Sequence, residues 1–529
     1  MTKLLNWLNY YWLTIAAGFL LVFLPLYPKW PLFDILPGYN VRVRLEDIII
    51  LAVNLIFWTQ VIFKKIRISR APLLKPILVY LVVGLLSTLS AIFITKTVYP
   101  EWIQVAKVFL HWVRRIEYFS LFFLFFFAVR TKRQLSGLLL LLGVTVLSVA
   151  IYGFGQKYLY WPAYSTMNRE FAKGIALYLT EHARVLSTFG GHFDLAAWVM
   201  MTIIPLIVLG LLHPSRWWRL AALSLAGVEY WLLILSASRI SWIAYMAGIL
   251  AAFAILLKKR SKLWVLPRGL AVVAVSTIVM MSFGDLSERF GHIFKLQGVK
   301  DLVMRPFTQP PRDGLPMALD LTLEQQLALV ATQTDVPPQP GPASAGQAGK
   351  PESSSGVKPA DVYDDTYDRL RAYLATTSGE TVNVNYSANA LKYGLSFGIR
   401  LDTLWPNALK ALKANPWLGT GYSTLVKEHV WEFTIAESTD NDYLRLLGET
   451  GLLGFISFLA IFYLAVRLMW QKYLAAKRPF DYALVCAALA VTFGLLVNAL
   501  YIDVFEASKV AYAYWSFLGL AMAGMYVKD

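Results

Sequence analysis

Long apolar runs separated by short polar connections dominate the hydrophobic pattern of this chain. A segment of about 20 mostly apolar residues is long enough to cross a bilayer as a helix. About twelve segments meet this condition, at residues 11–27, 46–63, 73–95, 108–129, 135–154, 194–212, 220–236, 241–257, 266–283, 451–470, 483–500 and 509–526. The pattern therefore predicts an all-α polytopic membrane protein with about twelve transmembrane helices.

Lysine and arginine gather in the connections that follow every second predicted span. These connections are "KKIRISR" (64–70), "RTKR" (130–133), "RWWR" (216–219), "KKRSK" (258–262) and "QKYLAAKR" (471–478). Short connections rich in Lys and Arg stay in the cytoplasm. Both termini are then predicted to be cytoplasmic. The connections predicted to lie outside are 28–45, 155–193 and 284–450.

The connection at 284–450 is far too long for a turn. Its centre, 334–360, is rich in Pro, Gly, Ser and Ala and nearly lacks large apolar residues, which predicts a disordered insert. Helical spacing predicts short amphipathic helices on the outer membrane face at 321–333, 361–377 and 400–416. The predicted organisation is spans 1–9 in 1–283, an extracytoplasmic region in 284–450 and spans 10–12 in 451–529.

Composition agrees with this class of protein. The chain is 57% hydrophobic and only 16% charged, whereas soluble domains are about 25% charged. The net charge of +16 is explained by basic cytoplasmic connections, so we expect no nucleic-acid partner. The single cysteine, Cys486, lies in an apolar run and predicts neither an intramolecular disulfide nor a cysteine-based metal site.

Motifs for nucleotide or metal chemistry are missing from the sequence. It contains no GxxxxGK[ST], no GxGxxG after a strand, no HExxH and no GxSxG. Asp440 and Asp442 have a spacing that suits a hard cation, but no nucleotide domain accompanies them. We expect no metal and no cofactor. An enzyme of this kind needs a substrate that arrives already activated, and a group carried on a lipid phosphate is the natural donor in a membrane.

Two stretches at the predicted outer face carry arginines that suit such a donor. "EHARVLSTFGGHFDLAAW" holds Arg184, a Gly–Gly turn and Asp194, and "SASRISW" is a hairpin turn with Arg239 at its tip. Arginine presents a fixed fork of donors that matches phosphate oxygens, so Arg184 and Arg239 together suit a diphosphate head group. The alternative for each is a guanidinium that extends to lipid head groups without binding substrate.

A third stretch, "STDNDYLRLLGETGLLG", precedes the tenth predicted span. Asp442, Arg445 and Glu449 are spaced three and four residues apart, which predicts a surface ion ladder on a helix. Asp440 and Asn441 come before the ladder and either cap the helix or act chemically. In the chemical alternative, Asp440 accepts a proton from an acceptor hydroxyl and Asn441 fixes its orientation. Because an ordinary Asp has a pKa of about 3.9, partial burial would have to raise that pKa, or a nearby Arg would have to lower the pKa of the acceptor.

Four stretches, taken in order, resemble the O-antigen ligase and polymerase family of bacterial membrane proteins. They are "RVLSTFGGHFDLAAW", "LSASRISWIAYMAG", "NPWLGTGYSTL" and "DNDYLRLLGETGLLG". The resemblance implies an all-helical, GT-C-like bundle in the cytoplasmic (inner) membrane. It also implies transfer of a glycan from an undecaprenyl diphosphate carrier to an acceptor hydroxyl outside the cytoplasm, without a metal or a nucleotide sugar.

The resemblance also assigns residues. The two family arginines that hold the diphosphate fall on Arg184 and Arg239, and the family's GxG turn falls on Gly419 and Gly421. Membrane lipid and the carrier-linked glycan are the implied partners. The acceptor hydroxyl belongs to a glycan, a lipid or a protein.

One departure bears on the choice between ligase and polymerase. Family ligases have a histidine where this chain has Asp440, which favours a polymerase-like or less typical transferase with Asp440 as the base. His429 would substitute for that histidine only if its loop folds back. Arg400 is a further candidate contact for phosphate or glycan.

Two other functions remain open at the level of sequence. One is a transporter or flippase of the same lipid-linked glycan, although the inverted repeats and broken helices of transporters are not visible. The other is a non-catalytic protein of polysaccharide assembly. The placement of the polar motifs at the predicted outer edge, rather than at mid-membrane, favours the transferase.

Overall fold

The computed structural model describes residues 2–34, 42–167, 171–180, 183–283, 387–427 and 436–527. Its long helices are α1 (Thr2–Leu26), α2 (Leu45–Ile62), α3 (Leu74–Phe93), α4 (Trp102–Ala128), α5 (Lys132–Tyr158), α6 (His192–Leu212), α7 (Arg216–Leu235), α8 (Arg239–Leu256), α9 (Lys262–Ser282), α17 (Asp442–Ala475), α18 (Pro479–Asn498) and α19 (Ser508–Tyr526). Each predicted span coincides with one of these helices. Two short antiparallel pairs join β1 (Pro31–Asp34) to β2 (Arg42–Arg44) and β3 (Val426–Lys427) to β4 (Ala436–Glu437).

Membrane-crossing character is clear for most of these helices. In the described part of the chain, nine helices are long and apolar enough to cross a membrane, namely α2, α3, α5, α6, α7, α8, α9, α17 and α18. The protein is therefore an all-α polytopic membrane protein. The count of twelve spans stays a prediction, because α1, α4 and α19 are not among the nine.

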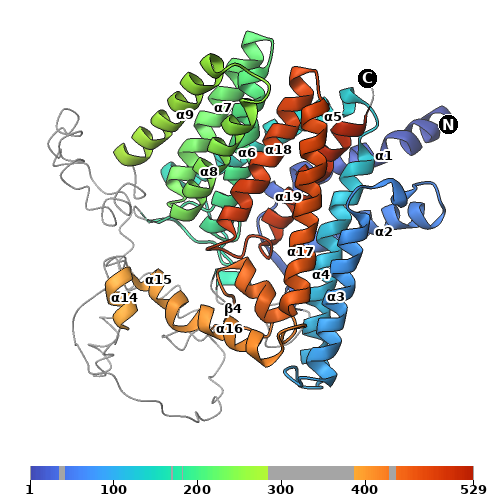
Figure 1. The fold of residues 1–529 in the computed structure, drawn as a ribbon, viewed down its shortest axis with the longest axis vertical. Coiled ribbons are helices and arrows are strands. Elements are labelled where there is room, and N and C mark those ends of the chain that lie inside the picture. The colour runs from blue at the N-terminus through green and yellow to red at the C-terminus, as the bar shows by residue number, and fades with distance from the viewer. Residues whose placement is uncertain are drawn as a thin grey trace.

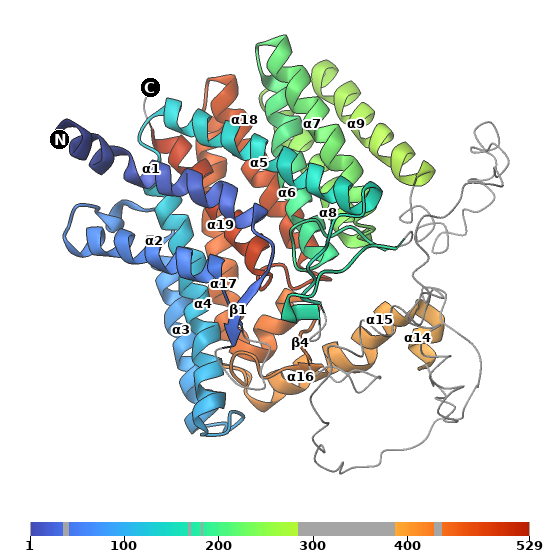
Figure 2. The ribbon, with the colours of Figure 1, turned by 180° about the vertical axis from the view of Figure 1, so that it is seen from behind.

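Helix α6 lies at the centre of the bundle because it is apolar on nearly every side. It packs against α7, α8, α18 and α19, while α19 also packs against α4, and α17 against α3. Helices α2 and α9 lie at opposite edges of the bundle (Figures 1 and 2). The core is thus formed where α6, α18 and α19 meet, and their buried residues belong to one apolar cluster.

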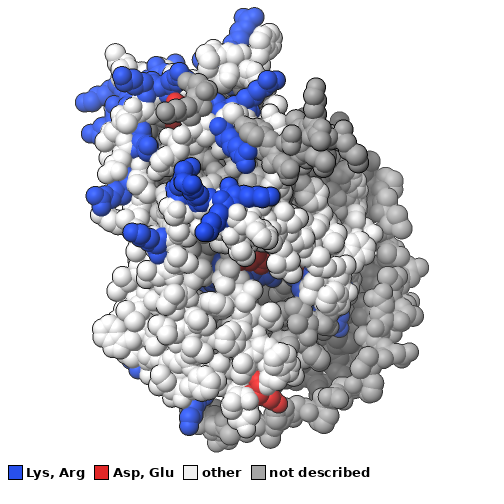
Figure 3. Space-filling model, turned by 90° about the vertical axis from the view of Figure 1, so that its right-hand side faces the viewer, with Lys and Arg blue, Asp and Glu red and all other residues white. Residues whose placement is uncertain are grey.

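Basic connections share one end of the bundle. The Lys259 amine donates to the carbonyls of Leu474 and Ala476, which joins the α8–α9 connection to the end of α17. Lys132 at the start of α5 pairs with Asp481 at the start of α18 at 2.5 Å. Figure 3 shows Lys and Arg side chains gathered on the upper part of one face. Such clustering is expected if the basic connections all lie on one side of the membrane. That this side is the cytoplasmic one stays a prediction.

Helix α17 is broken near its beginning. Gly451 has φ 65° and ψ −168°, which is not helical. Tyr443 and Phe455 lie on either side of it with ring centroids 6.4 Å apart, whereas twelve residues of straight helix would separate them by about 18 Å. The chain therefore doubles back, and residues 442–450 form a half-helix that lies against 452–475.

The loop before α17 satisfies the backbone groups that this break releases. The N–H groups of Leu452 and Leu453 donate to the carbonyls of Pro416 and Trp417 at 2.8 and 3.2 Å. An unpaired buried N–H would cost about as much as a lost hydrogen bond, so these contacts make the break tolerable. The predicted span start at 451 thus coincides with the break.

A layer of short helices precedes the half-helix. It consists of α14 (Ala388–Tyr393), α15 (Leu395–Ile399), a π-turn (Arg400–Leu404) and α16 (Trp405–Ala414), and α16 packs against α17. These helices lie across the lower end of the bundle in Figure 1. The helix expected at 400–416 is present as the π-turn and α16. The helices expected at 321–333 and 361–377, and the insert at 334–360, lie outside the described residues.

Gly451→Ala is expected to lower the thermal unfolding temperature. The combination of φ and ψ at Gly451 is essentially restricted to glycine, and a left-handed backbone alone costs an L-residue about 1–2 kcal/mol. A Cβ would also lie 2.4 Å from the carbonyl carbon of Trp417. Thermal unfolding of the detergent-solubilised protein, followed by tryptophan fluorescence, measures the effect.

Gly227→Ala is the matched control. Gly227 lies within α7, and a Cβ there meets nothing within 4 Å. Alanine is favoured over glycine inside a helix by about 0.5–1 kcal/mol, so this variant should unfold at the wild-type temperature or slightly above. Equal unfolding temperatures for the two variants would refute the argument for the break.

Candidate functional site

Asp440 lies immediately before the half-helix and faces Arg400 of the π-turn. The Arg400 Nη2 and Asp440 Oδ2 atoms are 2.9 Å apart, and the carboxylate is 26% exposed, whereas the arginine is only 5% exposed. The guanidinium also lies over the Tyr501 ring at 3.8 Å and donates to the Ser396 carbonyl at 2.5 Å. Arg400 and Asp440, which were predicted as separate site residues, therefore form one ion pair. The buried arginine holds the partly exposed carboxylate in place.

The backbone of Asp440 adopts an unusual conformation. Its φ of 50° is in the left-handed region, which is uncommon for a residue other than glycine. Ser438 stabilises this turn, because its hydroxyl donates to Asp440 Oδ1 at 2.7 Å and accepts from the Asp440 N–H at 3.1 Å. Strained residues of this kind persist when surrounding contacts hold them, and they are common at functional sites.

Asn441 makes the contacts of a helix cap. Its Oδ1 accepts from the Leu444 N–H at 3.0 Å, and its Nδ2 donates to the Leu500 carbonyl at 2.9 Å. The structure thus shows the capping alternative for Asn441. Its assignment as a catalytic residue stays a prediction.

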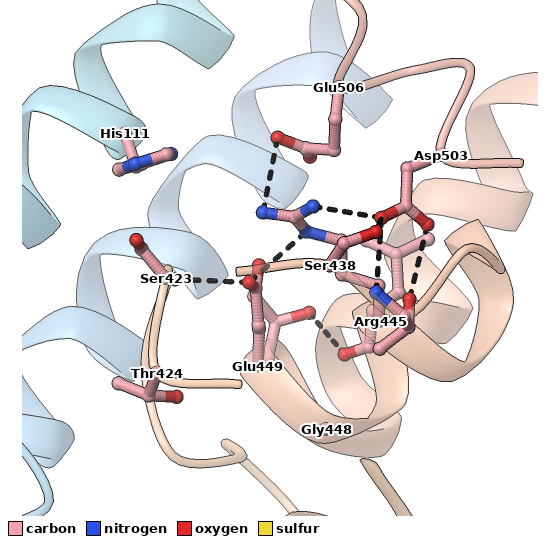
Figure 4. Close-up of polar contacts among 12 residues, drawn as sticks. His111, Ser423, Thr424, Ser438, Arg445, Gly448, Glu449, Asp503 and Glu506 are labelled. Atoms are coloured by element: carbon pink, nitrogen blue, oxygen red, sulfur yellow. Dashed lines mark hydrogen bonds and ion pairs between the residues drawn. The ribbon is translucent and has the colours of Figure 1, made fainter. Parts of the chain in front are cut away.

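Asp503, in the connection between α18 and α19, organises the turn that carries Asp440. Its Oδ1 accepts from the Asn441 N–H at 2.7 Å and from the Thr439 hydroxyl at 3.1 Å. Its Oδ2 accepts from the Thr439 N–H and from Arg445 Nη1 at 3.2 and 3.0 Å, and the Ser438 hydroxyl oxygen lies 3.0 Å from it. Figure 4 shows this carboxylate between Ser438 and Arg445. Sequence analysis missed Asp503 because it belongs to no recognisable motif.

The predicted surface ion ladder is wrong. Arg445 and Glu449 do pair, with Nε and Oε1 3.1 Å apart, but their side chains are only 7% and 3% exposed. Asp442 is buried too, and its carboxylate accepts from the Phe505 N–H at 3.2 Å. Because the chain doubles back at Gly451, this face of the half-helix is covered by the rest of the bundle instead of facing water.

Two further residues complete the buried cluster around Arg445. Glu506 pairs closely with Arg115 of α4, and its other oxygen lies 3.7 Å from Arg445 Nη2. Burial alone would raise the pKa of Glu506, but Arg115 and Arg445 outweigh it and leave this pKa below its ordinary value. Figure 4 shows the Arg445 guanidinium between the carboxylates of Glu506 and Glu449, with His111 of α4 on the side away from Asp503.

This cluster is too closed to receive a substrate. The cavity between its side chains has a volume of about 20 Å³, roughly the space of one water molecule. The buried charges therefore hold the half-helix and the 438–441 turn in place. The side chain of this region that a substrate can reach is that of Asp440.

Gly419 and Gly421 pack against the end of the half-helix. Their φ values are 67° and 95°, and the N–H groups of Thr420 and Gly421 donate to the carbonyls of Gly448 and Glu449, both at 2.9 Å. A Cβ on Gly419 would lie 2.4 Å from the carbonyl carbon of Glu449. Glycine is required here by close backbone approach. The predicted substrate contact of this turn stays a prediction.

Arg184 lies in an irregular segment that leads into α6. Its Nη1 is 2.6 Å from the His192 Nε2, and the neighbouring Val185 N–H donates to the Leu235 carbonyl at 3.1 Å. This backbone bond ties the segment to the end of α7. Arg184 therefore stands beside the α7–α8 turn.

Arg239 is the first residue of α8, directly after that turn, and it is half-buried. The Ser241 hydroxyl accepts from Asn498 Nδ2 at 3.2 Å, which joins α8 to the end of α18. Asn498 is two residues from Leu500, the partner of Asn441. Short contacts thus bring the segments of Arg184, Arg239 and Asp440 to the same end of the bundle.

Asp194 lies in the first turn of α6 beside a group of cations that were not predicted as site residues, of which Lys29 and Lys509 are buried. It interacts electrostatically with Lys29, Lys509 and Arg44. The Lys29 amine donates to the Ser508 hydroxyl at 2.8 Å. Burial lowers the pKa of Lys29, and the charge of Arg44 lowers it further. The sequence does contain an indication of these residues. Lys29 and Lys509 lie at the predicted outer ends of spans, where basic residues are not expected.

Comparison with known proteins agrees with the C-terminal part of the site. Residues 373–459 match the family model described as O-Antigen ligase. The matched segment includes Arg400, Gly419, Gly421, Asp440 and Asn441. No curated protein matches the chain. The match confirms the resemblance to the O-antigen ligase and polymerase family, and it supports glycan transfer of that general type.

Asp503→Ala is expected to destabilise the protein by about 3–5 kcal/mol. The substitution leaves part of the Arg445 charge unpaired in a buried place and removes the acceptor of two backbone N–H groups. Asp481→Ala is the matched control, because its pair with Lys132 is more exposed and should contribute no more than about 1 kcal/mol. Thermal unfolding of both variants tests the difference. Similar unfolding temperatures would show that Asp503 does not hold the turn.

Glu506→Gln is expected to lower the unfolding temperature in a pH-dependent way. The folded protein holds the pKa of Glu506 below its ordinary 4.5, so the stabilisation by the ionised form is present above about pH 4.5. It is lost as the pH falls through the folded-state pKa. The difference in unfolding temperature between wild type and Glu506→Gln should be constant from pH 8 to 5 and shrink at lower pH. A difference that grows on acidification contradicts this pairing.

Proposed function

We propose that this protein transfers or polymerises a glycan from an undecaprenyl-diphosphate-linked donor to an acceptor hydroxyl on the outer face of the bacterial cytoplasmic membrane. The observation that carries the proposal is the Asp440–Arg400 pair. It is partly accessible, it lies within the segment that matches the O-antigen ligase family, and it shares one end of the bundle with Arg184 and Arg239. Both termini would then be cytoplasmic.

In this proposal Arg184 and Arg239 bind the diphosphate. Guanidinium groups make charge-assisted hydrogen bonds with phosphate oxygens and keep their charge at any physiological pH. As the glycosyl bond breaks, negative charge develops on the leaving diphosphate, and the same two groups stabilise it in the transition state. Lys29, Arg44 and Lys509 outnumber Asp194 and Glu46 beside them and add positive potential on the side of Arg184.

Asp440 would act as the general base for the acceptor. Arg400 and the Ser438 hydroxyl each occupy one of its oxygens, but a carboxylate oxygen accepts more than one hydrogen bond. An acceptor hydroxyl would donate its proton to Asp440 while its oxygen forms the new bond to the anomeric carbon. The bond from that carbon to the diphosphate oxygen breaks in the same step, so a single displacement inverts the anomeric configuration. The donor is already activated, and the reaction needs no nucleotide or metal.

The acceptor would be lipid A core sugar for a ligase, another carrier-linked repeat unit for a polymerase, or a protein hydroxyl. Aspartate at position 440, where family ligases have histidine, favours a polymerase-like reaction. A carboxylate held by an arginine keeps its orientation without the ring of a histidine.

One observation favours the alternative of a lipid-linked-glycan transporter. Helix α17 is broken at Gly451, at the predicted start of its span, and transporters use helices broken near the midplane to bind their substrates. Here, however, the N–H groups that the break releases are occupied by Pro416 and Trp417. They are not available to a substrate, so the transferase remains the better proposal.

Arg239→Ala and Asp440→Asn are each expected to lower glycan transfer at least 100-fold. Loss of one donor to a developing charge costs about 10²–10³ in rate, and loss of a general base about 10²–10⁴. Arg239→Ala should also raise the KM for the carrier-linked donor, whereas Asp440→Asn should act on kcat. Membrane vesicles supplied with carrier-linked glycan and acceptor provide the assay.

Arg219→Ala is the control for this experiment, because Arg219 is an exposed arginine that donates to the His213 carbonyl in the α6–α7 connection. It should retain activity within about twofold of wild type, the size of a surface effect. A folded Arg239→Ala variant with full turnover would end the proposal. Movement of the glycan across the vesicle membrane without a new glycosidic bond would establish the transporter instead.

A further inference from the structure

An apolar cavity lies within the bundle, apart from the residues assigned to the reaction. It is bounded mainly by α1, α5, α6, α7 and α19 and has a volume of about 810 Å³. Its walls include Leu24, Leu147, Trp198, Leu206, Trp218 and Phe517. The volume is within the range of about 300–1,000 Å³ that is usual for sites that enclose a ligand.

The cavity is elongated along the helices. On α5 its lining extends from Arg133 to Leu147, and on α6 from Trp198 to His213. Fifteen or sixteen residues of helix correspond to a length of about 20 Å, which is two thirds of the hydrocarbon thickness of a bilayer. A long and narrow apolar space suits a hydrocarbon chain better than a compact ligand.

One side of the cavity faces the surroundings of the bundle. Leu140, Val144 and Leu147 of α5 line it and are 52%, 55% and 42% exposed. The opposite wall is buried, since Trp198 and Tyr512 are at most 1% exposed. In a membrane, a chain can therefore enter sideways between helices and remain covered along its inner side.

Glycines leave the space empty. A Cβ built on Gly137 or Gly143 of α5 meets nothing within 4 Å, although both residues line the cavity. In a well-packed bundle, helix glycines normally admit a neighbouring helix. Here no protein atom takes up the room that they provide.

Positive charge marks the end of the cavity nearest the reaction site. Lys509 lines this end, and its amine donates to the carbonyls of Thr188 and Tyr27 at 2.8 and 2.5 Å. Lys29 and Arg44 lie in electrostatic range of it together with two acidic residues, Glu46 and Asp194, so the cations outnumber the acids. Thr188 is four residues from both Arg184 and His192, so the cavity ends beside the proposed diphosphate site. An apolar chain with an anionic head group matches this distribution of charge.

We propose that this cavity holds the isoprenoid chain of the lipid diphosphate donor, with its head group at the Lys509 end. The identity of the donor rests on the proposed function, and the location of the chain rests on the cavity. The bound chain would bring the anomeric carbon to Arg184 and Arg239 at a fixed depth.

Gly143→Leu tests this proposal by filling the cavity from within. The added side chain meets no protein atom at its Cβ, and leucine suits a helix better than glycine does, so folding should be preserved. Gly227→Leu is the matched control, because it makes the same change on α7 with equal free space outside the cavity. The probe is a polyprenyl diphosphate with a photoreactive group near the chain end, added to reconstituted protein.

We expect wild type and Gly227→Leu to be labelled on α5 or α6 residues that line the cavity, and Gly143→Leu to lose at least 90% of that labelling. Peptide mapping of the wild-type label keeps the test valid if Gly143→Leu folds poorly. Labelling elsewhere, or labelling unchanged in a folded Gly143→Leu protein, overturns the proposal. So does equal cavity labelling by a photoreactive phosphatidylglycerol in the presence of excess polyprenyl diphosphate, because the cavity would then be a general lipid site.

A transfer assay separates this inference from the proposed function. With a long-chain donor, Gly143→Leu should transfer glycan at least tenfold more slowly than Gly227→Leu. With a donor of a single isoprene unit, the two variants should agree within twofold, since so short a chain ends before the filled region, which begins one helical turn from Leu147. An equal loss of transfer rate in Gly143→Leu with both donors would overturn the proposal that the isoprenoid chain occupies this cavity. Specific labelling without any glycan transfer by wild type would refute the proposed function and leave the lipid site intact.

Discussion

The carboxylate of Asp503 is the contact on which the geometry of the candidate site depends. It joins the half-helix, through Arg445, to the turn that carries Asp440, and it does so from a different part of the chain. A buried charge is stable only when it is paired and hydrogen-bonded, and Asp503 meets this condition with four donor groups. The left-handed backbone of Asp440 persists because Asp503 holds the residues on both sides of it.

The break at Gly451 makes this arrangement possible. If α17 were straight, residues 442–450 would extend beyond the end of the bundle, and Arg445 and Glu449 would not be covered by it. Doubling back brings them under Glu506 and beside Arg115 of α4. The half-helix thus has a polar face that is buried. It is stable only because the charges on that face are paired. The glycines at 419 and 451 serve the same end, since each permits a close approach of two backbones, and Gly421 leaves room for the side chain of Ala91 in α3.

The sequence predicts the transmembrane helices well because one local property, a run of apolar residues, determines them. It also places Arg184, Arg239 and Asp440 in three separate segments, which the structure joins at one end of the bundle. The prediction of a surface ion ladder is wrong for a physical reason. Spacing of three and four residues shows that Asp442, Arg445 and Glu449 share a helical face, but it does not show what covers that face. The covering depends on a reversal at a single glycine, and on Asp503 and Glu506, which no local pattern marks.

The α18–α19 connection relates the two charged groups of the molecule. Asp503 and Glu506 point toward the half-helix and α4, whereas Ser508 and Lys509 contact Lys29 and the segment at 188. Acidic residues outnumber the arginines on the side of the proposed base, whereas Lys29, Arg44 and Lys509 outnumber Asp194 and Glu46 on the side of the proposed diphosphate. In the proposed reaction, a short, well-paired connection between them would fix the distance from the donor to Asp440. Since effective catalysis of a displacement requires reacting groups within about 3–3.5 Å, a rigid link of this kind is what the proposed reaction needs.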